Sequence, residues 1–209
     1  MNTHMLTLPE ELMVLGINPG RAKGLVLRHH LHYGMAGALL SELEWRGRVA
    51  ENRGKVVALA GPAAGDPLFD AGLALLRADK PVRTRRWISR HAGAVSESCA
   101  ERLVQRGVLR IESRRVLGLF RSRSYHLTDL DLARHVLADF QGAAKLGFPD
   151  PRSRTLAALA GAIDLSRRIV PDTGNKKELR RSIRALTRET WSAHAVRRII
   201  EAESSDGGG

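Results

Sequence analysis

Small residues recur along one predicted helix near the N-terminus, and they limit what the chain can fold into more than any other sequence feature. The helix spans roughly residues 32–45, and its small members are Gly34, Ala36, Gly37, Ala38 and Ser41. Side chains of this size let a neighbouring backbone approach closely. Leucines at positions 39, 40 and 43 supply an apolar stripe on the same helix. The sequence therefore predicts a core helix that packs at short distance against other elements.

Local signals place another helix before this one. Thr7 and Glu10 have the spacing of a capping box, in which the hydroxyl accepts a backbone N–H and the carboxylate reaches back to the start of the helix. Pro9 lies in the first turn, where a missing N–H costs nothing. Glycines and a proline within residues 16–20 then end this helix. We therefore expect two helices joined by a glycine-rich turn.

The rest of the chain alternates helical and strand patterns. Further helices are expected after the capping residue Asp66, over 82–91 and 96–106, from 128 to near 147, from 150 through 165 to an end before Pro171, and over 178–190 and 191–203. Hairpins are expected where 48–51 pairs with 55–59, and where 108–111 pairs with 116–120 around a turn at 112–115. The predicted fold class is mostly α, a single globular helical domain over residues 1–203 with two short β-hairpins. A flexible tail follows at 204–209.

Charge and cysteine content restrict the partners and the compartment. The 209 residues carry a formal net charge of +12, which attracts polyanions such as nucleic acid or an anionic membrane. No apolar run reaches the roughly 20 residues that cross a bilayer, and the N-terminus lacks the pattern of a signal peptide. The single cysteine, Cys99, fits a reducing compartment. A basic cytoplasmic protein is therefore expected, with an arginine- and alanine-rich composition typical of GC-rich bacterial genomes.

Four segments in a fixed order carry a family resemblance. They are the opening at 6–50, the run PAAGDPLFD at 62–70, the run ERLVQRGVL at 101–109, and the segment at 150–170 that begins with Asp-Pro. Together they cover nearly the whole chain from residue 6 to about 202, and on them the chain resembles the Golgi phosphoprotein 3 family as a bacterial-type member. The resemblance implies a peripheral membrane protein, associated with the inner face of a membrane, that binds anionic membrane lipids and specifically phosphatidylinositol 4-phosphate.

The resemblance also places the family's headgroup site on this sequence. The family's tryptophan position falls on Leu27, one arginine position on Ala36, and an arginine pair on Gly93 and Ser96. All four are changed, and neither alanine nor glycine offers the forked donors with which arginine binds phosphate. The headgroup site is therefore expected to differ from that of the family.

Basic residues beside these positions could form an anion site of shifted geometry. Arg28 adjoins the first of them, and Arg90 and His91 lie just before the third. The apolar residues 25–27 could insert shallowly into the bilayer interface. Alternatively, they pack in the core and the arginines are merely solvated.

The second hairpin is the element that, by the resemblance, mediates self-association. Its residues are Arg115, Val116, Leu117, Leu119 and Phe120. An exposed apolar hairpin could insert into a second copy or into lipid, or it could fold against its own domain. The charged N-terminal arm that contacts vesicle coat in eukaryotic members has no counterpart in this sequence, so no coat-protein contact is expected.

Two other functions remain open on the residues alone. The run 96–120 has the helix–strand–turn–strand order of a winged-helix DNA-binding unit, with arginines at its turn and a net charge that agrees. Against it, the helix before the hairpin exposes Glu97 and Glu101, whereas a major-groove helix usually carries more donors. A scaffold that binds protein partners through the small-residue helix is the other alternative.

Catalysis and metal binding are not expected. The sequence contains no P-loop, dinucleotide fingerprint or nucleophile elbow, so no cofactor and no catalytic residue is predicted. His29, His30 and His32 are close together, but adjacent histidines point in different directions and no carboxylate or cysteine lies nearby at ligand spacing. Cys99 lies on an apolar helix face and is expected to be a buried thiol.

Overall fold

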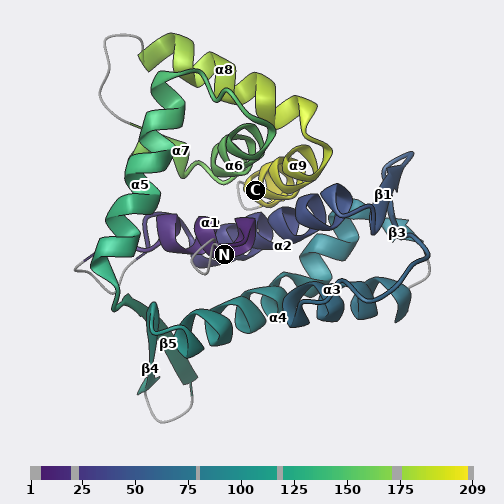
Figure 1. Cartoon of the computed structure of the whole chain (residues 1–209), viewed down its shortest axis with the longest axis horizontal. Coiled ribbons are helices and arrows are strands. Elements are labelled where there is room, and N and C mark those ends of the chain that lie inside the picture. Colours follow the sequence, from purple (N-terminus) through teal and green to yellow (C-terminus); the bar gives the residue numbers. More distant parts are fainter. Residues whose placement is uncertain (1–5, 20–23, 79–80, 117–119, 171–175, 207–209) are drawn as a thin grey trace.

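The chain folds into helices with two small antiparallel sheets (Figure 1). The computed structural model describes residues 6–19, 24–78, 81–116, 120–170 and 176–206. In chain order the elements are α1 (Leu8–Gly16), α2 (Arg28–Trp45), β1 (Val49–Asn52), β2 (Lys55–Ala58), α3 (Pro67–Ala78), β3 (Val82–Arg83), α4 (Thr84–Gln105), β4 (Leu109–Val116), β5 (Phe120–Leu127), α5 (Leu130–Lys145), α6 (Pro151–Ala162), α7 (Ser166–Ile169), α8 (Lys176–Glu189) and α9 (Trp191–Asp206). The predicted fold class, mostly α with two hairpins, is confirmed.

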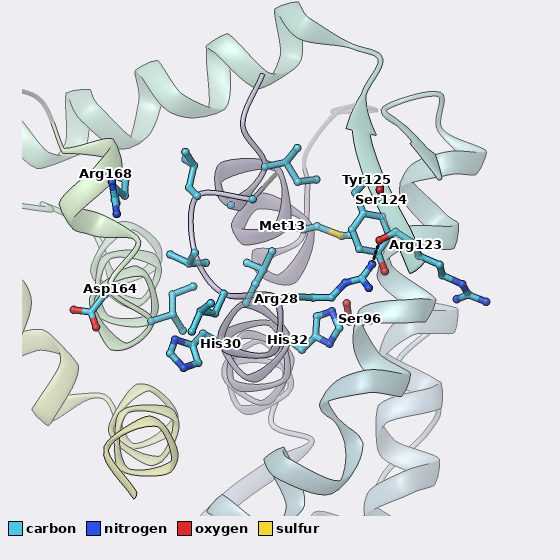
Figure 2. A pocket seen from close by; sticks show the side chains of 18 residues that line it. Met13, Arg28, His30, His32, Ser96, Arg123, Ser124, Tyr125, Asp164 and Arg168 are labelled. Carbon is cyan, nitrogen blue, oxygen red and sulfur yellow. Dashed lines mark hydrogen bonds between the residues drawn. The ribbon is translucent and has the colours of Figure 1, made fainter. Parts of the chain in front are cut away.

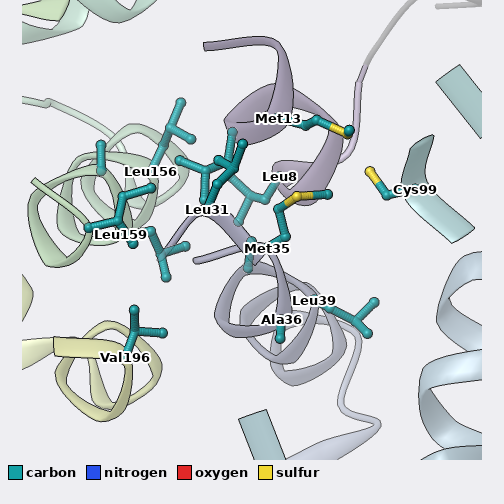
Figure 3. Close-up of a cluster of buried hydrophobic side chains, with 14 of the residues drawn as sticks. Leu8, Met13, Leu31, Met35, Ala36, Leu39, Cys99, Leu156, Leu159 and Val196 are labelled. Carbon is teal, nitrogen blue, oxygen red and sulfur yellow. The ribbon is translucent and has the colours of Figure 1, made fainter. Parts of the chain in front are cut away.

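Helix α2 forms the centre of the fold, as its small residues predict. It runs between α4 on one side and α6 and α9 on the other (Figure 1). Gly37 faces Leu159 of α6 and Val196 of α9, and a β-carbon at Gly37 would lie 3.0 Å and 2.9 Å from these side chains. Met35 and Ala36 are fully buried in the same cluster (Figure 3). The lack of side-chain bulk on α2 therefore sets the short distance between these helices.

The two N-terminal helices differ in how well the sequence defines their starts. The capping box of α1 is present, and the Thr7 N–H donates to Glu10 Oε2 at 2.8 Å. Helix α2 begins at Arg28, four residues before the predicted start. Its N-cap, Leu27, makes no side-chain capping hydrogen bond, so no residue type marks this start in the sequence.

The prediction of separate helices over 82–91 and 96–106 is wrong. Helix α4 is continuous over 22 residues, and Gly93 lies inside it. Trp87, Val95 and Leu103 are buried along one face, so packing continues across the glycine and outweighs the cost of about 1 kcal/mol of a glycine in a helix. Residues 82 and 83 are not helical, because they pair with β2 as the third strand of the first sheet.

The first predicted hairpin is confirmed, but the turn of the second is misplaced. Strand β1 pairs with β2 from Val49↔Ala58 to Asn52↔Lys55. In the second sheet, residues 112–115 lie within β4 and pair with 121–124, and the pairing closes at Val116↔Phe120. The predicted turn has the sequence Glu-Ser-Arg-Arg, without glycine, proline or asparagine, whereas the stretch between the strands contains Gly118. Turn chemistry therefore favours the later position.

The C-terminal helix is longer than predicted. Helix α9 extends to Asp206, so residues 204–206 of the expected tail are helical, and residues 207–209 lie outside the described part of the chain. Across the described helices, none combines the length and the apolar composition that crossing a bilayer requires.

Candidate functional site

A pocket opens where α1, α2, α4 and β5 meet. We call this cavity the α2 pocket. It is lined by the end of α1, residues 24–27, the first turns of α2, and side chains from α4, β5 and the region of α6 and α7. Its volume is about 610 Å³. Segments more than 100 residues apart in the sequence therefore contribute to one cavity (Figure 2). Volumes of this size are typical of pockets that bind small molecules.

The turn between α1 and α2 positions the rim of the pocket. Ile17 and Gly24 form an isolated antiparallel bridge, and the Leu25 N–H donates to the Gly16 carbonyl at 2.9 Å. This closure brings the chain back to the end of α1 and leads into Leu27, whose side chain is 60% exposed. An exposed leucine thus lies at the mouth of the α2 pocket, directly before the basic residue that opens α2.

Two arginines of the pocket, Arg28 and Arg168, have no carboxylate partner within the part of the chain that the structure describes. The Arg28 guanidinium lies 5.0 Å from the centre of the Tyr125 ring and donates to the Arg123 carbonyl. Aromatic stacking of this kind holds a guanidinium in place without neutralising its charge. Arg168 lies across the pocket from Arg28 (Figure 2).

The one aspartate of the pocket is already paired. Asp164 Oδ2 lies 3.0 Å from Arg197 Nη1, and its Oδ1 lies 3.2 Å from Arg167 Nε. Its negative charge is therefore offset by arginines that do not line the cavity. The remaining electrostatic character of the α2 pocket is positive, which favours an anionic ligand.

Two buried polar atoms face this pocket without a hydrogen-bond partner among the described residues. They are His32 Nε2 and Ser96 Oγ, and Figure 2 shows both side chains beside Arg28. Burial, together with the charges of Arg28 and His29, lowers the pKa of His32 to about 4, so this imidazole is neutral at pH 7. An unpaired buried polar group costs about 1–3 kcal/mol. A ligand with hydroxyl or phosphate oxygens would satisfy both groups.

The structure brings together two of the four positions that the resemblance assigned to the headgroup site. Leu27 and Ser96 both line the α2 pocket, one at its rim and one buried inside. Ala36 is fully buried in the core between α2 and its neighbours and does not line it (Figure 3). Gly93 lies on the exposed side of α4, where an added β-carbon would meet nothing within 4 Å.

Of the neighbouring basic candidates, only Arg28 reaches the pocket. Arg90 lies exposed on α4, and the His91 ring packs 5.1 Å from that of Trp87. Sequence reasoning missed Tyr125 and Arg168, which reach the α2 pocket through the tertiary fold. No local pattern marks either residue, because their proximity to α2 depends on where β5 and α7 pack.

The second hairpin projects from the body of the protein (Figure 1). Arg115, Val116 and Phe120 belong to its paired strands, whereas Leu117 and Leu119 lie outside the described residues. Ile111 and Tyr125, near its base, are partly buried against the core. Self-association through this hairpin stays a prediction.

The thiol of Cys99 is fully buried, as predicted. Burial raises its pKa well above the ordinary value, with the charge of Glu10 acting in the same direction. Because the thiolate is the reactive form, this cysteine is a poor nucleophile.

Comparison with known proteins places the chain beside a described family and a curated relative. The model of the family described as Golgi phosphoprotein 3 (GPP34) matches residues 8–202. Vacuolar protein sorting-associated protein 74 of Eremothecium gossypii is 26% identical over 131 residues, a match that covers 51% of this chain and 40% of that protein. The family match spans nearly the whole chain, from α1 to α9, whereas the chain covers less than half of this curated relative.

Proposed function

The chain belongs to the Golgi phosphoprotein 3 family, and on this premise we propose that it is a non-enzymatic peripheral membrane protein that binds an anionic lipid headgroup in the α2 pocket. By family resemblance the headgroup is phosphatidylinositol 4-phosphate. The protein then lies on the cytoplasmic face of a membrane, with the rim of the pocket toward the lipid.

One arrangement carries this proposal. An exposed leucine, Leu27, stands beside a guanidinium, Arg28, at the mouth of a pocket whose interior holds the unpaired polar atoms of His32 and Ser96. A membrane lipid offers matching chemistry, since its acyl region accepts the leucine and its phosphate oxygens accept hydrogen bonds from the polar groups. A purely polar ligand would leave the leucine without a role.

The expected free energies of the individual contacts are modest. A basic side chain near an anionic membrane surface contributes about 1 kcal/mol. Transferring a leucine side chain out of water contributes at most about 2 kcal/mol, and a shallow insertion less. Self-association through the second hairpin would multiply such weak contacts by avidity.

DNA binding finds less support. In the helix before the second hairpin, Arg102 Nε lies 3.0 Å from Glu10 and Arg106 Nη1 lies 3.3 Å from it. Glu97 and Glu101 are exposed on the same stretch of α4. Arginines that bind a buried carboxylate are not available to read base edges, and exposed acids repel phosphate.

The scaffold alternative also loses its proposed surface. The small-residue face of α2 is buried, and a β-carbon at Gly34 would lie 2.9 Å from Leu12 and 3.1 Å from Ile163. The chain's own helices therefore occupy the face that a protein partner would need.

Vesicle flotation tests the lipid proposal. Phosphatidylcholine vesicles, with or without phosphatidylserine and with or without phosphatidylinositol 4-phosphate, are mixed with the full chain at about 0.15 M salt. We expect the wild-type protein to float with anionic vesicles only. Arg28→Ala should weaken binding about fivefold, the equivalent of about 1 kcal/mol, and Leu27→Ser should weaken it further.

Arg134→Ala is the matched control, because it removes the same charge from an exposed position on α5, where Arg134 pairs with Asp131. If both arginine variants lose binding equally, the net charge of the protein determines vesicle binding and the α2 pocket makes no specific contribution. Absence of binding to every anionic vesicle would contradict the proposal. Equal binding to all anionic headgroups would support membrane binding but contradict specificity for the phosphoinositide.

A further inference from the structure

Three metal-ligating side chains meet where the first turn of α2 approaches the last turns of α9. His29 Nε2 lies 3.5 Å from Glu203 Oε2, and His30 Nε2 lies 3.9 Å from the same oxygen. The three ligand atoms all lie within 4.8 Å of one another. Two residues adjacent in sequence therefore converge on a carboxylate that follows them by more than 170 positions.

We propose that His29, His30 and Glu203 bind a divalent transition-metal ion of the zinc class. Two imidazole nitrogens and one carboxylate oxygen make a ligand set that zinc uses in proteins, with the fourth position left to water. Tetrahedral zinc with bonds near 2.1 Å needs ligand atoms about 3.4 Å apart. The observed separations approach this spacing, and side-chain rotation at this partly exposed site can close the remainder.

A neighbouring residue already orients the carboxylate. Tyr33 donates its hydroxyl hydrogen to Glu203 Oε1 at 2.6 Å, which leaves Oε2 facing the two histidines. Metal-binding side chains are commonly held by such outer hydrogen bonds, which reduce the cost of ordering them when the ion binds. Tyr33 lies one helical turn after His29 and His30, so the same face of α2 supplies two ligands and the group that positions the third.

Two electrostatic effects oppose a cation at this place, and one is the positive charge of Arg197, which acts on His30. The histidines lie in the first turn of α2, where the helix dipole is positive. The full negative charge of Glu203 and the two metal–nitrogen bonds act against both. Borderline-soft ions that prefer imidazole are therefore favoured over Mg²⁺ and Ca²⁺, which prefer sites made of oxygen ligands.

The sequence argued against a metal because adjacent histidines point in different directions and no ligand is nearby in the chain, and the structure contradicts both grounds. The ligand nitrogens of His29 and His30 lie within 4.8 Å of each other. No carboxylate is close to the histidines in sequence, but α9 brings Glu203 to them in space. A bound ion would cross-link α2 to α9 near the α2 pocket, which His30 also lines. Metal binding does not depend on the proposed lipid function, and either can be present without the other.

Isothermal titration of the full chain with zinc chloride tests the proposal, using protein purified without a histidine tag. We expect one ion bound per chain, a rise in melting temperature on addition of zinc, and no comparable effect of magnesium chloride. His29→Ala, His30→Ala and Glu203→Gln should each weaken zinc affinity at least about tenfold. Circular dichroism of each variant would establish that it still folds.

His135→Ala provides the control, since this histidine lies exposed on α5 and its ring bonds only locally, to the Asp131 carbonyl oxygen. It should bind zinc like the wild-type chain. The proposal is overturned if the wild-type chain binds no zinc, or if the His29→Ala/His30→Ala double variant keeps wild-type affinity. It is also overturned if the His135→Ala variant loses as much affinity as the cluster variants.

Discussion

A buried carboxylate links the N-terminal helix to the rest of the molecule. Glu10 is fully buried; it accepts a hydrogen bond from the Thr7 N–H at 2.8 Å and forms an ion pair with Arg102, whose Nε lies 3.0 Å from Oε1. Arg102 also forms an ion pair with Asp66, which precedes α3. The sequence predicted the capping role of Glu10 from its distance to Thr7. Its pairing with arginines of α4 could not be predicted, because more than 90 residues separate them.

Removing this carboxylate should destabilise the fold strongly. Glu10→Ala leaves the Thr7 N–H, Arg102 of α4 and Arg106 at the C-cap of α4 without their shared partner. Breaking a buried ion pair costs about 3 kcal/mol or more. Urea denaturation followed by circular dichroism would measure the loss. Asp131→Ala removes an exposed carboxylate that pairs with Arg134 and should change stability by less than about 0.5 kcal/mol. Equal effects of the two variants would show that the burial of Glu10 contributes nothing.

At the scale of elements, packing distance separates glycines that look alike in sequence. Gly37 and Gly93 both lie inside long helices, α2 and α4. A β-carbon at Gly37 would meet Val196 at 2.9 Å, whereas one at Gly93 would meet nothing within 4 Å. The same substitution therefore has opposite consequences at the two sites.

Gly37→Ala should destabilise the protein and Gly93→Ala should stabilise it. Alanine in a helix interior is favoured over glycine by about 0.5–1 kcal/mol. At position 93 that gain is realised in full. At position 37 it is outweighed by an overpacking cost of about 1–3 kcal/mol, since the buried side chains of Val196 and Leu159 must shift. The difference between the two urea midpoints measures the contrast, and a Gly37→Ala variant as stable as Gly93→Ala would refute close packing around α2.

The charge of the whole molecule governs its approach to a membrane. A formal net charge of +12 is spread over surfaces well beyond the α2 pocket, including the arginine-rich helix α8. Such a field attracts anionic membranes at a distance, but it does not select one headgroup from another. Selection requires the localised groups of the pocket.

Binding to anionic vesicles should therefore fall steeply with salt. Raising sodium chloride from about 0.05 M to about 0.5 M shortens the Debye length and should weaken the apparent affinity at least about tenfold. Flotation at a series of salt concentrations measures this slope. Affinity that stays constant across the series would mean that apolar insertion near Leu27, and not net charge, dominates binding.

The sequence predicted an element correctly when the residues that determine the element lie close together in the chain. Capping residues, helix periodicity and the first hairpin were predicted because each depends on neighbours within a few positions. The continuity of α4 across Gly93 was missed, because packing against the core overrides a weak local preference. The second hairpin was predicted with the wrong turn, because alternation alone fixes neither length nor register.

The sequence by itself determined the mostly helical class, the small-residue helix at its centre and the family to which the chain belongs. Only the tertiary structure decided which side chains share a site. Leu27, Arg28 and Arg168 meet at one pocket, and Glu203 meets His29 and His30, because helices far apart along the chain pack together. Helices and turns follow from short-range hydrogen bonds and sterics. A site made of residues far apart in the sequence depends on how the helices pack around the core, and no local sequence pattern predicts that packing.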